Sequence, residues 1–149
     1  MKKILVVGQT PPPYGGQAIM IKYMLDSQYT DIKMYNVRMC FSREFDARGK
    51  LSVHKILHIF TIIYRIWIMK FRHNIDVMYY PPSSTPKIAV LRDVIILGFT
   101  RFLFKKNVFH FHASGISEEL PKYNILLRRI ISLCNSLIIS ADILQNTST

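Results

Sequence analysis

Short apolar runs alternate with longer runs of helical periodicity along the whole chain of 149 residues. The short runs predict strands at residues 3–8, 32–39, 75–80, 107–112 and 135–140. The longer runs predict helices at residues 17–27, 53–71, 86–104 and 118–133, and Pro86 suits the first turn of the third. This order predicts an α/β fold, a Rossmann-like parallel sheet with helices on both faces.

The size and composition predict one folded domain over residues 1–149. Hydrophobic residues make up 50% of the chain and charged residues 19%, which excludes a disordered protein. The two cysteines, Cys40 and Cys134, exclude a disulfide scaffold and match no metal or redox spacing. We expect them to be reduced thiols in or near the core of a cytosolic protein.

Export and membrane insertion are not predicted. Lys2 and Lys3 precede an apolar run, residues 4–7, that is too short for a signal peptide. The two longest apolar stretches, residues 51–69 and 88–104, are interrupted by charged side chains and are too short to be clean membrane spans. The sequence therefore predicts a cytoplasmic protein.

Positive charge is concentrated in the middle of the chain. The formal net charge is +11, and residues 47–116 hold eleven Lys and Arg against two Asp. Such a field attracts phosphates, anionic lipid headgroups or nucleic acid. A solvated rim on the helices is the alternative interpretation, and the charge pattern alone does not decide between them.

Ligands of parallel sheets bind at the carboxyl ends of the strands, which directs attention to the loops 9–16, 81–86 and 113–117. In the first loop, Gly15 and Gly16 lead directly into a predicted helix. Glycine permits close backbone approach, and a helix N-terminus suits a phosphate. The alternative is a tight strand-to-helix connection that needs glycine for its geometry alone.

The other two loops offer a histidine and several hydroxyls. His110 and His112 lie on one face of their strand, and His112 is the better functional candidate because it ends that strand. His110 is interpreted as a core histidine. Ser83 and Ser84 could bind sugars or phosphates, whereas Thr85 is better explained as a helix cap.

Several catalytic signatures are absent from the sequence. It contains no Asp-x-Asp pair, no HExxH, no G-x-S-x-G and no Walker loop. It also contains no recognisable nucleic-acid-binding motif. We therefore expect no metal cofactor and no nucleic-acid partner.

Four segments together resemble the N-terminal domain of family 4 glycosyltransferases of the two-domain GT-B type. They are KILVVG with QTPPPYGGQA, then VMYYPPSSTPKIAVLRD, then KKNVFHFHASGI, and finally NSLIIS. Their order and spacing match over nearly the whole chain.

This resemblance implies transfer of a sugar, with retention, from a nucleotide-sugar donor to a glycan or lipid-linked acceptor in envelope polysaccharide synthesis. It implies that His112 faces the reacting sugar and that Gly15 and Gly16 approach the donor phosphates. The acceptor side would comprise Tyr14, Gln17, Ser83, Ser84 and Ser114. It also implies work at the inner membrane face, where the basic segment could contact anionic headgroups peripherally.

The sequence departs from that family by lacking the C-terminal domain that grips the donor. Its glutamates, Glu44, Glu118 and Glu119, do not form the family's pair separated by seven residues. We therefore expect little or no sugar transfer by this chain alone, and a separate C-terminal half as a partner. Two alternatives are a non-catalytic module that binds a glycan lipid or membrane surface, and a nucleotide- or nucleic-acid-binding domain of another kind.

Overall fold

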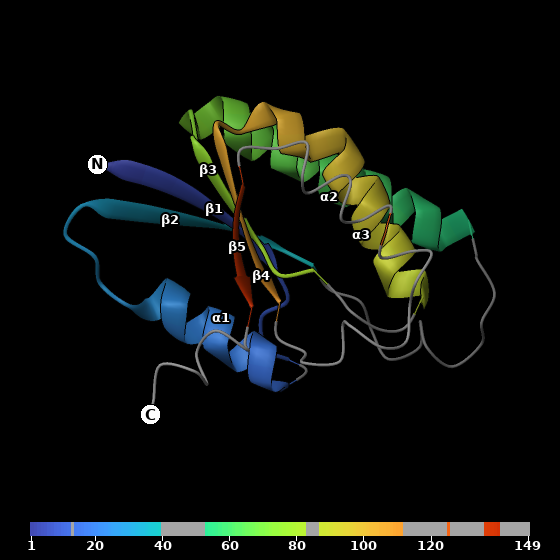
Figure 1. Cartoon of the computed structure of the whole chain (residues 1–149), viewed down its shortest axis with the longest axis horizontal. Coiled ribbons are helices and arrows are strands. Elements are labelled where there is room, and N and C mark those ends of the chain that lie inside the picture. The colour runs from blue at the N-terminus through green and yellow to red at the C-terminus, as the bar shows by residue number, and fades with distance from the viewer. Residues whose placement is uncertain (13, 40–52, 83–86, 112–124, 126–135, 141–149) are drawn as a thin grey trace.

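The computed structural model describes residues 1–12, 14–39, 53–82, 87–111, 125 and 136–140 (Figure 1). They form one sheet of five parallel strands in the order β2-β1-β3-β4-β5. The strands are β1 (Lys2–Gly8), β2 (Ile32–Arg38), β3 (Val77–Tyr80), β4 (Lys106–Phe111) and β5 (Ser136–Ser140). The predicted α/β fold with a parallel sheet is confirmed.

Helices cover both faces of this sheet, as predicted. α1 (Gly16–Asp26) lies on one face, and α2 (Val53–His73) and α3 (Lys87–Thr100) lie side by side on the other (Figure 1). The connection from β1 to β2 runs in one direction along the sheet, and those from β2 to β3 and β3 to β4 run in the other. Right-handed crossovers therefore require opposite faces. The predicted helix at 118–133 lies outside the described residues, apart from Ile125.

Three element boundaries differ from the prediction by two residues or more: α2 extends to His73, β3 begins at Val77 and α3 ends at Thr100. Asn74 adopts a left-handed conformation with φ of 49°, and the N–H of Ile75 donates to the carbonyl of Lys70 at 3.3 Å. This arrangement ends α2 with a Schellman-type cap, so β3 begins at Val77 rather than at 75. α3 ends at Thr100, and the chain then tightens into the short helix η2 (Arg101–Leu103).

The larger core lies between the sheet and the α2/α3 layer. Its fully buried side chains come from β1, β3, β4 and both helices, and include Leu5, Ile62, Ile66, Met78, Tyr80, Ile96, Leu97 and Phe109. Complete burial of one such side chain contributes about 1.5–3 kcal/mol. This layer therefore supplies most of the apolar stabilisation within the described residues.

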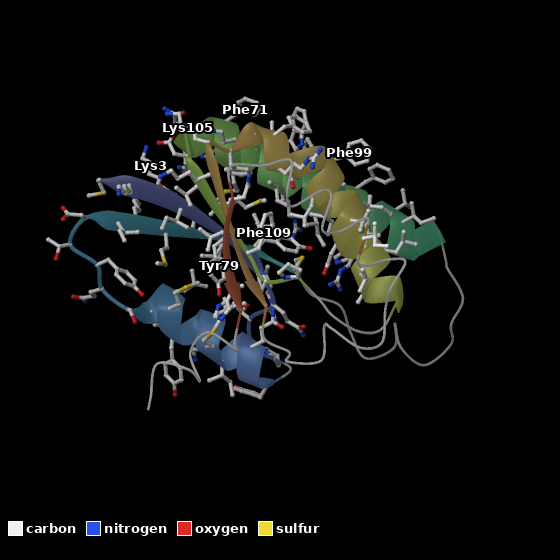
Figure 2. The ribbon with its side chains drawn as sticks, in the orientation of Figure 1. Lys3, Phe71, Tyr79, Phe99, Lys105 and Phe109 are labelled. Carbon is white, nitrogen blue, oxygen red and sulfur yellow. The ribbon has the colours of Figure 1, made fainter. Side chains whose placement is uncertain are left out.

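The core beneath α1 is smaller. Val6, Ile21 and Tyr79 are its buried members, and Ile4, Met20, Met24, Leu25, Met34 and Val108 pack around them. Figure 2 shows Tyr79 on the α1 side of the sheet and Phe109 on the α2/α3 side. α1 packs very close to β1, since a Cβ added at Gly8 would lie 2.6 Å from Cδ1 of Ile21.

Candidate functional site

The strand order places a topological switch point between β1 and β3. The chain leaves β1 toward β2 on one side and leaves β3 toward β4 on the other. In open parallel sheets this divergence forms a crevice at the carboxyl ends of the strands. The segment that follows Gly8 and the segment that follows Tyr80 border this position.

The segment after β1 is held from the neighbouring strand. Nη2 of Arg38, the last residue of β2, donates to the carbonyl of Pro12 at 2.7 Å. The N–H of Met39 donates to the carbonyl of Gly8 at 3.0 Å and extends the pairing of β1 with β2. These two bonds fix the path of the chain from the sheet edge toward α1.

The glycines that begin α1 are not required by the backbone. Gly15 has φ of −120° and ψ of 157°, a conformation open to any residue. A Cβ added at Gly15 or at Gly16 would meet no atom within 4 Å. The structure therefore shows no steric reason for glycine at these two positions, whereas a Cβ at Gly8 would crowd the side chain of Ile21.

The first turn of α1 combines exposed backbone with exposed side chains. Gly15 provides no side-chain cap, and the turn contains no acidic residue. Tyr14 is 77% exposed, and Gly15, Gly16 and Gln17 are exposed as well. A helix start of this kind carries partial positive charge and N–H donors that suit an anion. Four predicted site residues, 14–17, are consecutive in the sequence and lie exposed at this helix start.

A buried charged network ties β3 to α3 beside the switch point. The hydroxyl of Tyr80 donates to Oδ1 of Asp93 at 2.8 Å, and Arg92 donates to the same oxygen from Nε at 2.8 Å and from Nη2 at 2.7 Å. The side chain of Asp93 is fully buried and that of Arg92 is 15% exposed. Because Tyr80 ends β3 and Asp93 lies within α3, the network joins the two elements that flank residues 81–86.

The charges in this network support one another. Burial and the negative charge of Asp93 hold the pKa of Tyr80 well above its ordinary value, so its hydroxyl stays a donor. Burial lowers the pKa of Arg92, but the interactions with Asp93 and Tyr80 together outweigh that effect, and the net shift is upward. Arg92 therefore keeps its positive charge in an ion pair that helps to join β3 to α3.

A second polar pair lies on the opposite face of the sheet. The hydroxyl of Tyr79 and Nδ1 of His110 share a hydrogen bond of 2.7 Å, with their rings edge to face. Burial raises the pKa of Tyr79 to about 12 and lowers the pKa of His110. Both groups are consequently uncharged at neutral pH, which agrees with the interpretation of His110 as a packed histidine of the strand.

The remaining predicted site residues, His112, Ser83, Ser84 and Ser114, lie outside the described residues. Sequence reasoning did not assign a role to the network of Tyr80, Arg92 and Asp93. An adjacent Arg-Asp pair inside an apolar helical run was the available signal, because a buried charge must be paired.

Within the described ranges, no three His, Cys, Asp or Glu side chains gather in a way that could hold a metal ion. Among the same residues, no helix has the length and apolar character needed to cross a bilayer. Comparison with known protein families, with curated proteins and with solved structures gives no match for this chain.

Proposed function

We propose that this chain is the acceptor-side domain of a GT-B glycosyltransferase, which transfers a sugar from a nucleotide-sugar donor to a glycan or lipid-linked acceptor. One observation carries the proposal. The segment with Gly15 and Gly16 starts α1 at the switch point, and neither glycine is needed by the fold. Open backbone at a helix start is what the approach of a diphosphate requires.

The loop 81–86, which follows β3 in the sequence, is proposed to form part of the acceptor side. The strand and the helix that flank it, β3 and α3, are joined by the buried network of Tyr80, Arg92 and Asp93. Fixed flanking elements support the precise positioning that a transfer reaction needs. Ser83 and Ser84 are then proposed to contact the acceptor, together with Tyr14, Gln17 and Ser114.

His112 is proposed as the catalytic residue that faces the sugar. In the sequence it is the next residue after β4, whose carboxyl end lies at the same edge of the sheet as those of β1 and β3. Binding of the nucleotide-sugar donor is assigned to a separate C-terminal half, which would complete the cleft. The chain alone is expected to bind a nucleotide sugar weakly and to transfer sugar poorly.

The test is a titration of the 15N-labelled chain with a panel of nucleotide sugars. Binding is monitored through changes in the amide chemical shifts. We expect the largest changes at Gly15, Gly16, Gln17 and Ala18. Gly16→Val should weaken binding at least about tenfold, since side-chain bulk would block the backbone. Gly98→Val is the matched control, because Gly98 is also an exposed helical glycine with no atom within 4 Å of an added Cβ.

Shifts that appear elsewhere, or equal affinity for Gly16→Val and the unmodified chain, would contradict the proposed phosphate site. Absence of binding for every nucleotide sugar, combined with vesicle binding, would instead favour a non-catalytic module that holds a glycan lipid or a membrane surface.

A further inference from the structure

Large apolar side chains gather on the outer surface of the α2/α3 layer. On α2 these side chains recur at helical spacing and form one stripe. α3 and η2 add three further apolar side chains. We call this set the outer ridge: Leu57, Phe60, Tyr64, Ile68, Phe71, Leu91, Phe99 and Phe102. Figure 2 shows Phe71 and Phe99 on the side of the helices that faces away from the sheet.

The ridge is ordered by contacts among its own rings. Trp67, half-buried at its centre, has its ring centroid 6.0 Å from that of Phe71 and 6.1 Å from that of Phe102. Its indole N–H donates to the carbonyl of Phe99 at 3.2 Å. The ring centroids of Phe99 and Phe60 are 6.4 Å apart. Even so, Phe71 remains 67% exposed and Phe102 63% exposed. Contiguous apolar surface of this kind marks an interaction site.

The charges next to the ridge are positive. Arg65 and Arg72 are exposed on α2, and Lys106 is exposed where β4 begins. Residues 53–106 contain nine Lys and Arg and only two acids. Of these acids, Asp93 is buried against Arg92, and Asp76 forms an ion pair with Lys105 at 2.9 Å.

We propose that the outer ridge and its basic neighbours form a surface that docks on an anionic lipid bilayer, with α2 and α3 parallel to the membrane plane. Aromatic and aliphatic side chains enter the boundary between headgroups and acyl chains, and Lys and Arg pair with lipid phosphates. A second copy of the chain would bring an equal charge of +11 against these basic residues, which disfavours self-association.

This surface is separate from the proposed phosphate site. α1 covers the opposite face of the sheet, so a chain docked through α2 and α3 keeps α1 on the side away from the bilayer (Figure 1). The docking proposal does not rest on sugar transfer, because vesicle binding is measured without donor or acceptor.

Trp67 provides the readout, since it is the single tryptophan of the chain. The unmodified chain is mixed with vesicles of phosphatidylglycerol and phosphatidylcholine that carry bromine on their acyl chains. We expect quenching of Trp67 emission, binding that weakens with added salt, and little binding to pure phosphatidylcholine. Binding without quenching would place another surface on the membrane and overturn the proposal.

Paired variants locate the surface. Phe71→Ser with Phe102→Ser should weaken vesicle binding about tenfold or more. The control is Tyr23→Ser, because Tyr23 is 70% exposed on α1, and it should leave binding unchanged. Arg72→Gln should weaken binding several-fold, whereas Lys22→Gln on α1 should not.

Three further results would overturn the proposal: equal effects of the ridge and α1 variants, absence of binding to anionic vesicles, and a dimer in light scattering that the ridge variants dissociate. Tighter binding to single-stranded RNA than to vesicles, lost in the same ridge variants, would assign the surface to nucleic acid instead. Circular dichroism of each variant verifies that it remains folded.

Discussion

The two faces of the sheet are built in different ways. Among the described residues, the α2/α3 face has the larger core and contains a largely buried ion pair, Arg92 with Asp93. The α1 face has three buried core members within the described part of the chain, and a neutral hydrogen bond between Tyr79 and His110. The difference indicates that, within that part, the α2/α3 layer contributes more to stability, whereas the α1 layer leaves the first turn of α1 exposed.

The largest expected effect comes from the buried ion pair. Asp93→Ala removes the shared acceptor of Tyr80 and Arg92 and leaves a largely buried guanidinium without its counter-charge. We expect a loss of about 3–5 kcal/mol in the free energy of unfolding, measured by urea denaturation. Asp76→Ala is the control, because Asp76 is 44% exposed in its pair with Lys105, and it should change stability little. Similar losses in both variants would contradict the importance of burial for the pair of Arg92 and Asp93.

Tyr79 and Tyr80 are neighbours in β3 whose side chains pack on opposite faces of the sheet, so they allow the two faces to be compared directly. Tyr80→Phe deletes a buried hydrogen bond to a carboxylate and should cost about 1.5–3 kcal/mol. Tyr79→Phe deletes a neutral hydrogen bond to His110 and should cost about 0.5–1.5 kcal/mol. Both free energies come from the same denaturation assay. A larger cost for Tyr79→Phe would contradict the assignment of stability to the α2/α3 face.

The smallest expected effect is a dependence on pH. Burial lowers the pKa of His110 in the folded chain, so the unfolded chain binds this proton first as the pH falls. The stability contributed by neutral His110 is therefore present above about pH 6.5 and is lost as the pH falls through the folded pKa. His110→Gln should flatten the stability profile over that window. An unchanged profile would show that His110 is not the group responsible.

Periodicity predicted the strands and helices well, because continuous apolar runs and 3.6-residue spacing follow directly from burial. The misplaced start of β3 came from Asn74, whose left-handed conformation ends α2 and cannot be read from apolar spacing. The surroundings of the glycines cannot be predicted from apolar spacing either. A Cβ at Gly8 would crowd Cδ1 of Ile21, whereas a Cβ at Gly15 or Gly16 would meet no atom within 4 Å.

Composition indicated a basic surface but not its location. In the sequence, His54, His58, Thr61 and Arg65 recur at helical spacing along residues 53–71 and mark one polar stripe. The structure also exposes an apolar stripe on this helix, which includes Phe60, Tyr64 and Phe71. A helix that is apolar on two sides has more apolar surface than one sheet can cover.

Hydrogen exchange tests the division of roles most directly. The exchange map of the whole chain is recorded alone, with a nucleotide sugar and with anionic vesicles. The account predicts that the nucleotide sugar slows exchange at residues 14–19, and that vesicles slow it in the outer segments of α2 and α3 and in η2. Protection of α1 by vesicles, or protection of the α2/α3 layer by the nucleotide sugar, would contradict the account.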